Sequence, residues 1–173
     1  MSIREFKIRI PDEQLNDLSS RLKNTKWAYQ MLDNEWKLGT NSHYLKSLVT
    51  YWTNCYNWRE QEQILNQYPQ YKCKIDDVDI HFFHIKGKEK NSTPLILSHG
   101  WPDSFIRYQK IIPLLTDPVS YGGKTSDSFD LIIPSLPGFG FSTMSELKGI
   151  NNNMIADLWA KLMIDELGYS KFG

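Results

Sequence analysis

Two short apolar runs, each ending in a turn rich in proline or glycine, constrain this chain more than any other feature. The first, Leu95-Ile96-Leu97, stops at Ser98-His99-Gly100-Trp101-Pro102, and the second, Phe129 to Ile133, stops at Pro134. Such a run predicts a strand buried on both faces. In open α/β sheets ligands bind at the loops that follow the carboxyl ends of strands, so both turns are candidate site segments.

The first turn also offers a backbone hydrogen-bond donor. A tight turn can point a free amide at a developing oxyanion, and one such donor contributes about 3 to 4 kcal/mol to transition-state stabilisation. The amide of Trp101 is our candidate donor. The competing interpretation is purely structural, a buried strand followed by a proline-stiffened turn.

The N-terminal part of the sequence predicts helices. Leu15, Leu18 and Leu22 repeat at helical spacing after Pro11. A second helix is expected from Ser42, and a third from Trp58 to Tyr68, where Pro69 would end it. Between the first two, the apolar residues have no clean period and predict an aromatic meander packed on another surface: Trp27, Tyr29, Met31, Leu32, Trp36 and Leu38.

The second half of the sequence predicts a hairpin, because apolar residues alternate on both sides of Asp76-Asp77. These residues are Tyr71, Cys73, Ile75, Ile80 and Phe82. Two histidines of the same segment, His81 and His84, raise the question of a metal site. Residues three apart in a strand point to opposite faces, so we expect no shared ion.

Two further helices are expected in this half. After the first turn, Asp103 or Ser104 can cap a helix that Pro113 kinks or ends. The last helix should begin in the cap region Asn151 to Asn153 and stop at Gly168, and Tyr169 to Gly173 should then start a new strand.

The turn sequences resemble those of a known family. His99-Gly100-Trp101-Pro102 after an apolar strand, followed further on by Pro-Ser-Leu-Pro-Gly-Phe-Gly-Phe-Ser at residues 134–142, resembles the oxyanion-hole loop and next strand-loop of α/β-hydrolase-fold epoxide hydrolases. Trp52 through Asn66 resembles the N-terminal domain of their microsomal and juvenile-hormone branch, so the resemblance covers nearly the whole chain. It implies an α/β fold class, with residues 1–71 as a helical meander and residues 72–173 as the first part of an α/β-hydrolase core with an incomplete sheet.

The resemblance also implies a chemistry. In this family a carboxylate opens the epoxide and the resulting ester is hydrolysed to a vicinal diol, while backbone amides hold the ester oxyanion. Gly100 to Pro102 would form the oxyanion loop, with the Trp101 amide as donor and a cis Trp101–Pro102 peptide. His99 precedes the turn, and its implied role is to hold the loop.

The remaining catalytic groups are expected elsewhere. The sequence contains no Gly-x-Ser-x-Gly, and the resemblance places the aspartate nucleophile, the acid and the base beyond Gly173. Although the family is one of enzymes, we expect this chain alone to be inactive. A strand at Leu95 to Ser98 that lacks one neighbour would favour self-association or binding of a complementing C-terminal chain.

Composition narrows the partners. Lys plus Arg number 20 and Asp plus Glu number 20, so no global field attracts nucleic acid or an anionic membrane. Two cysteines are too few for a disulfide scaffold. No run approaches the ~20 apolar residues of a membrane-spanning helix. The N-terminal residues contain no signal-peptide core. We expect a cytoplasmic protein whose complete enzyme binds a small-molecule epoxide and uses no cofactor.

Two other functions remain open at this point. One is a non-catalytic or decayed α/β-hydrolase fragment that acts as an interaction module through its aromatic meander. The other is a different aspartate-nucleophile hydrolase, such as a dehalogenase, which the N-terminal resemblance disfavours. Arg59, Glu60 and Glu62 could form a functional cluster, but their helical spacing is more typical of a solvated face or a local salt bridge.

Overall fold

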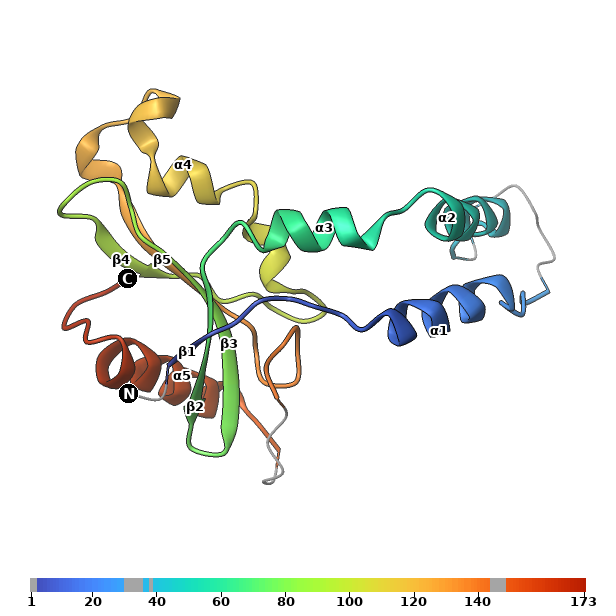
Figure 1. Cartoon of the computed structure of the whole chain (residues 1–173). Coiled ribbons are helices and arrows are strands. Elements are labelled where there is room, and N and C mark those ends of the chain that lie inside the picture. The colour runs from blue at the N-terminus through green and yellow to red at the C-terminus, as the bar shows by residue number, and fades with distance from the viewer. Residues whose placement is uncertain (1–2, 30–35, 38, 144–148) are drawn as a thin grey trace. The chain divides into compact units, whose positions relative to one another are not determined.

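Two compact units make up the chain, which Figure 1 traces from end to end. The computed structural model describes residues 3–29, 36, 37, 39–143 and 149–173. One unit comprises Ile8–Leu65, and the other comprises Met1–Lys7 with Asn66–Gly173. The boundary expected after residue 71 falls inside the second unit, within strand β2 (Gln70–Ile75).

Three helices form the unit of residues 8–65: α1 (Asp12–Lys23), α2 (Ser42–Asn54) and α3 (Trp58–Leu65). All three were predicted. The Asn41 side chain caps α2 by accepting a hydrogen bond from the Tyr44 amide at 3.0 Å. Helix α3 ends at Leu65 rather than at Tyr68, because a residue that precedes proline disfavours the helical conformation and the chain needs the intervening residues to turn into β2.

Glu62 is the buried polar centre of this unit. Its Oε1 accepts hydrogen bonds from the Ile10 amide at 2.7 Å and from Trp58 Nε1 at 3.2 Å, and Arg59 Nη1 donates to Oε2 at 2.7 Å. Arg59 also pairs with Asp12. Burial raises the pKa of Glu62, but these donors outweigh it and the pKa is lowered overall. The predicted local salt bridge is therefore confirmed by the Arg59–Glu62 pair within α3. The Arg59–Asp12 pair joins α3 to the start of α1.

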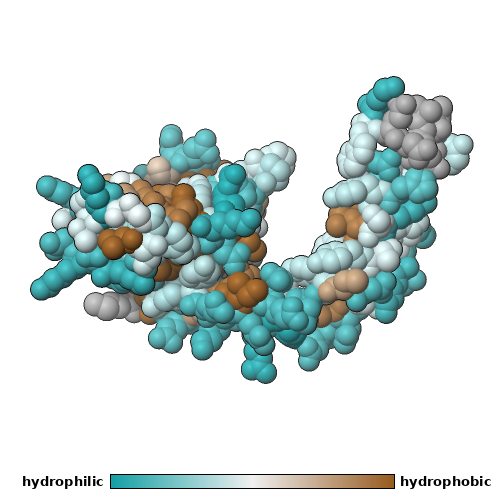
Figure 2. All heavy atoms as spheres, turned by 90° about the horizontal axis from the view of Figure 1, so that it is seen from above, coloured by the Kyte–Doolittle hydropathy of each residue, from teal (hydrophilic) through white to brown (hydrophobic). Residues whose placement is uncertain are grey.

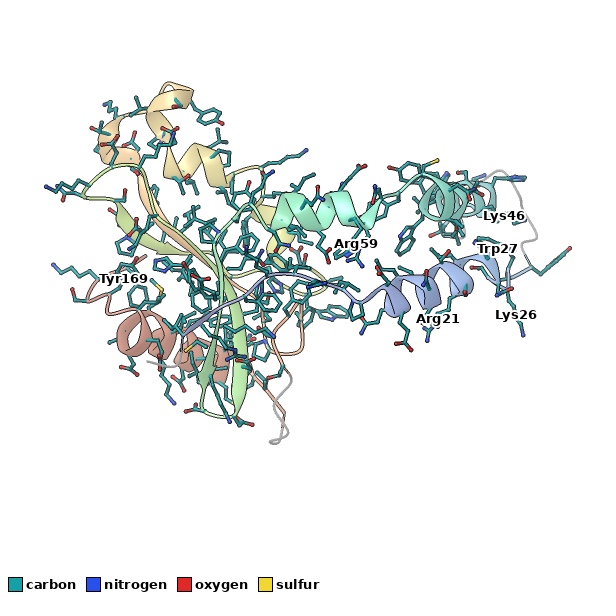
Figure 3. The ribbon with its side chains drawn as sticks, viewed as in Figure 1. Arg21, Lys26, Trp27, Lys46, Arg59 and Tyr169 are labelled. Carbon is teal, nitrogen blue, oxygen red and sulfur yellow. The ribbon has the colours of Figure 1, made fainter. Side chains whose placement is uncertain are left out.

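The aromatic meander is largely exposed in this unit where the structure describes it. Tyr29 is 91% exposed, Trp27 and Trp36 are also classed as exposed, and Lys46 Nζ lies 5.9 Å from the centre of the Trp27 ring (Figure 3). Met31, Leu32 and Leu38 lie outside the described residues.

The second unit is built on a five-stranded mixed sheet of order β1-β2-β3-β5-β4. Its strands are β1 (Arg4–Glu5), β2, β3 (Val78–Ile85), β4 (Thr93–Ile96) and β5 (Phe129–Pro134). Only the β4–β5 pair is parallel among the strand pairs of the described residues. The predicted hairpin is confirmed: Ile75 pairs with Val78 around a turn in which Asp76 has a φ of +54°.

Helices cover both faces of this sheet. Helix α5 (Asn152–Lys161) and the π-helical turn Leu162–Glu166 pack on one face. The 3-10 helix Phe105–Tyr108 and α4 (Ile112–Thr116) pack on the other, where Phe105 meets Phe83 at a ring-centre distance of 5.0 Å. Short 3-10 helices at Pro118–Tyr121 and Thr125–Asp127 complete the connection to β5.

The two apolar runs differ in burial. Leu131, Ile132 and Ile133 of β5 are fully buried, as predicted. Leu95 to Leu97 are only half-buried, so the prediction of a strand buried on both faces was wrong for the first run. The physical reason is position: β4 is the outermost strand of the sheet that the described residues form.

Pro113 was assigned the wrong role. The segment after the first turn is a 3-10 helix, and Pro113 lies in the first turn of the separate helix α4. Proline is tolerated there because the first amides of a helix have no intrahelical acceptor. Ser104 stands at the cap position of the 3-10 helix but makes no side-chain cap bond.

The end of the chain partly follows the prediction. Asn151 caps α5 by accepting from the Met154 amide at 3.1 Å, and Gly168 stops the helical segment with a φ of +74°. Tyr169 to Gly173 is not an assigned strand. Gly173 nevertheless lies beside β4 (Figure 1), where its amide donates to the Pro94 oxygen at 3.0 Å and its oxygen accepts from the Ile96 amide at 2.9 Å.

His81 is fully buried in the sheet unit. Its Nε2 lies 3.0 Å from Gln70 Oε1 and its Nδ1 lies 2.9 Å from Ser135 Oγ, so a neutral ring with the proton on Nε2 satisfies both contacts. Phe105 and Phe141 pack edge-on against the ring. Burial, with a smaller contribution from Lys72, lowers the pKa of His81 to about 3.

This depressed pKa predicts an acid-sensitive stability. Between pH 6.5 and about 3 the unfolded chain binds a proton at His81 that the folded chain does not, so this residue removes about 1.4 kcal/mol of stability for each pH unit lowered. Urea unfolding gives the free energy of unfolding at each pH, and the slope of this free energy against pH gives the number of protons taken up on unfolding. In this range that number should be about one larger for the unsubstituted chain than for His81→Gln. Above pH 7, where the histidine is neutral in both states, the slopes should agree; equal slopes in the acid range would contradict the assignment.

Candidate functional site

The parallel pairing of β4 and β5 brings the two predicted turns together. Leu95 pairs with Leu131 and Ile96 with Ile132, and the Leu97 amide continues the ladder by donating to the Ile132 oxygen at 2.9 Å. Because both strands run in the same direction, the turn at 98–102 and the loop after Pro134 leave the sheet at the same end of the strands.

His99 connects these two segments. It is 3% exposed, and its Nε2 accepts a hydrogen bond from the Leu136 amide at 3.1 Å. The nitrogen that accepts carries no proton, so Nδ1 bears it and donates to the Gly100 oxygen at 3.0 Å. The Phe139 ring packs edge-on against the imidazole at a centre distance of 5.6 Å. One neutral ring thus joins the turn after β4 to the loop after β5.

The turn itself is open to solvent. Trp101 is 83% exposed, and the Trp101–Pro102 peptide is cis, as predicted. No hydrogen bond between described residues uses the Trp101 amide. A Cβ built on Gly100 would meet no heavy atom within 4 Å, so there is free space beside the turn. The Trp101 amide therefore has no acceptor among the described residues, and the turn beside it is open to solvent.

Two side chains that the sequence analysis did not assign to the site hydrogen-bond to Ser98, the first residue of the turn. Tyr108 Oη donates to the Ser98 oxygen at 2.7 Å, and Trp159 Nε1 donates to Ser98 Oγ at 3.2 Å. Tyr108 lies in the 3-10 helix and Trp159 in α5, and nothing in the sequence around either residue points to Ser98. Asp103 orders the exit of the turn by accepting from the Ser104 amide at 2.8 Å and pairing with Arg107.

The loop after β5 folds back along β3. The Ser142 hydroxyl donates to the Ser135 oxygen at 2.8 Å and accepts from the His81 amide at 2.9 Å. Gly140 has a φ of +52°, and a Cβ there would lie 2.6 Å from Ser135 Oγ. The positive φ and this close approach both favour glycine at position 140.

The two histidines of β3 point to different surroundings. His81 contacts Ser135 and Gln70, whereas His84 Nε2 lies 2.9 Å from the Tyr169 hydroxyl. Within the described ranges, no group of three or more His, Cys, Asp or Glu side chains has a metal-binding arrangement.

A family model described as the epoxide hydrolase N terminus matches residues 3–108 of this chain. The chain belongs to this epoxide hydrolase family. The matched range runs from the start of β1 through the helical unit and the 98–102 turn to the end of the 3-10 helix at Tyr108. The resemblance inferred from the turn sequences is confirmed.

Individual relatives agree with this assignment. Epoxide hydrolase 1 of Sus scrofa is 42% identical over 175 residues, covering 99% of this chain and 38% of the pig protein. Juvenile hormone epoxide hydrolase 2 of Ctenocephalides felis is 41% identical over 174 residues, covering 99% and 37%. The chain therefore spans less than half the length of these relatives.

Solved structures support the fold. The crystal structure of juvenile hormone epoxide hydrolase from the silkworm Bombyx mori superposes with a TM-score of 0.89 at 34% identity, covering 99% of this chain and 40% of the silkworm chain. The predicted fold class, a helical segment followed by the first part of an α/β-hydrolase fold, is confirmed. No helix in the described residues is long and apolar enough to cross a membrane.

Replacing His99 tests its role in joining the two loops. His99→Phe keeps a planar ring but leaves the Leu136 amide without its acceptor, and an unsatisfied group of this kind costs about 1 to 3 kcal/mol. Urea unfolding should show a loss of that size, and hydrogen exchange should show reduced protection of the Leu136 amide. Phe139→Leu serves as the control, since it alters packing on the ring and keeps the hydrogen bond. If Leu136 keeps its protection in His99→Phe, the assigned bridge is wrong.

Proposed function

We propose that this chain supplies the oxyanion-binding turn of an enzyme that hydrolyses small-molecule epoxides to vicinal diols. The observation that carries the proposal is the Trp101 amide, which donates to no acceptor among the described residues and lies in the turn that follows β4. His99 fixes the turn and Gly100 leaves space beside it. Membership of the epoxide hydrolase family and the names of the relatives support the substrate class.

The proposed reaction has two stages. A carboxylate attacks one epoxide carbon, the carbon–oxygen bond breaks, the alkoxide takes up a proton, and an ester forms. Water then adds to the ester carbonyl as a base takes one of its protons, giving a tetrahedral oxyanion. The oxyanion collapses with cleavage of the ester carbon–oxygen bond, and its hydroxyl proton passes to the leaving alkoxide, which gives the diol and the free carboxylate. The Trp101 N–H would donate to that oxyanion, and a fixed donor of this kind stabilises the transition state because it needs no reorganisation.

The roles of individual residues follow from this scheme. Trp101 acts through its backbone, Gly100 and Pro102 shape the turn, and His99 positions the turn through two hydrogen bonds. We assign the nucleophile, acid and base to the part of the longer relatives that lies outside the match. Residues 1–71 act in this proposal as the helical meander and residues 72–173 as part of the hydrolase core, and no cofactor takes part.

A cytoplasmic location belongs to the same proposal. Cys55 is exposed and Cys73 is buried, and both are free thiols. Free thiols are typical of reducing compartments.

A chimera tests the proposed activity. In pig epoxide hydrolase 1, this chain would replace the matching N-terminal part, and hydrolysis of styrene oxide would be measured. We expect turnover from the chimera and only background from the 173-residue chain, because loss of a single member of a catalytic unit already costs orders of magnitude. A folded chimera without turnover, beside an active pig enzyme, would contradict the proposal.

The same chimera isolates the backbone donor. Trp101→Pro removes the amide proton and should lower kcat by about 10² to 10³, whereas Trp101→Phe keeps the proton and should retain most of the rate. Folding of each variant would be checked by circular dichroism, and equal rates for the two folded variants would exclude Trp101 as the donor.

We further propose that the 173-residue chain needs a complementing C-terminal chain to cover its apolar surface. Aliphatic side chains, brown in Figure 2, reach the surface of both units. The exposed apolar residues include Leu48 and Ile106 and the aromatic residues Tyr51, Trp52 and Trp101. Leaving them uncovered costs about 25 cal/mol for each Å². Without such a chain, light scattering should detect self-association of the protein. A sharp monomer with one cooperative thermal transition would contradict this prediction.

A further inference from the structure

The hydroxyl of Tyr169 is held by three polar side chains from the sheet. Lys86 Nζ donates to it at 2.6 Å, and it donates to Asp130 Oδ2 at 3.0 Å. His84 Nε2 lies 2.9 Å away and supplies a second donor. The phenol oxygen therefore has its full set of partners, one acceptor and two donors.

These three side chains also restrain one another. Lys86 and Asp130 form an ion pair at 2.8 Å, and the Gly87 amide donates to Asp130 Oδ1 at 2.9 Å. Burial lowers the pKa of His84 and the Lys86 charge adds to this, while Asp130 acts in the opposite direction. A neutral His84 beside a paired lysine and aspartate gives the hydroxyl a fixed set of partners near pH 7.

The position of Tyr169 in the chain gives this cluster its significance. Tyr169 follows Gly168, which ends the helical segment begun by α5, and it lies at the start of the segment that returns to the sheet (Figure 3). The returning segment reaches β4 at Gly173, which hydrogen-bonds to Pro94 and Ile96 on either side of Leu95. The side-chain cluster lies upstream of this pairing and is separate from the turn at Trp101.

We infer that the polar cluster on the Tyr169 hydroxyl sets the register in which the returning chain joins β4. The short connection from Tyr169 to Gly173 leaves little freedom once the hydroxyl is fixed. Register matters because a shift of one residue turns every following side chain to the opposite face of the sheet. Tyr169 is thus a positioning residue, with His84, Lys86 and Asp130 as its anchors.

This inference deepens the proposed function in one respect. In a parallel pair each further residue lies beside the next residue of its neighbour, so a chain continuing past Gly173 would come level with Leu97, where the turn at 98–102 begins, after about two residues. The pig and silkworm relatives are more than twice as long as the matched part. Under the proposed function, the register at Gly173 decides which residue reaches the start of the turn that contains the Trp101 amide.

Single-residue hydrogen exchange on the 173-residue chain tests the inference without any epoxide. Tyr169→Phe keeps the ring and removes the hydroxyl. We expect protection of the Ile96 and Gly173 amides, which bond across this junction, to fall about tenfold, because hydrogen bonds to charged groups are among the stronger ones. The Leu97 amide, which donates to Ile132 on the other side of β4, should keep its protection.

The reference amide separates positioning from general stability. If Ile96 keeps its protection, or if Ile96 and Leu97 lose it in equal proportion, the inference is overturned. Lys86→Met should reproduce the selective loss in part, and it replaces Tyr169→Phe if that variant does not fold. Lys88→Met is the matched control, because Lys88 pairs with Asp117 and does not contact Tyr169. Since no turnover is measured, the result is independent of the test of the proposed function.

Discussion

The parallel pairing of β4 with β5 is the interaction on which the rest of the sheet unit depends. It pairs Leu95 with Leu131 and places the carboxyl ends of both strands on the same side of the sheet unit. The turn at His99–Pro102 and the loop from Pro134 to Thr143 meet there only because the two strands share a direction. In an antiparallel pair the turn and the loop would lie at opposite ends of the strands, and His99 could not have reached the Leu136 amide.

The two buried histidines of this unit have a hydrogen-bond partner on each ring nitrogen. His81 and His99 are both buried, and each places one ring nitrogen as a donor and the other as an acceptor. A neutral imidazole is suited to this because it offers one of each, so no charge is buried and neither nitrogen lacks a partner. Each ring also hydrogen-bonds to a residue that is distant in the sequence, Ser135 for His81 and Leu136 for His99, and so connects two segments of the chain.

The two units differ in what stabilises them. The sheet unit has a core of buried side chains on both faces, whereas α1 and α2 bury none of the residues that the structure describes. In the unit of residues 8–65, Glu62 and its donors provide a polar connection between α1 and α3. The family model spans both units, so membership rests on the helical unit as well as on the turn.

The sequence by itself determined the local elements and the family. Alternation predicted the hairpin and leucine spacing predicted α1, because each depends on neighbours in the chain. The family followed from a resemblance carried jointly by the His-Gly-Trp-Pro turn, residues 134–142 and Trp52 through Asn66. Tertiary structure decided what depends on distant neighbours. The half-burial of β4 follows from its position at the edge, and the contacts of Ser98 with Tyr108 and Trp159 follow from helices packing behind the turn. The cluster of His84, Lys86 and Asp130 on Tyr169 likewise joins residues far apart in sequence. No periodicity encodes such contacts, since they arise only when the strands and the segment after α5 are placed together.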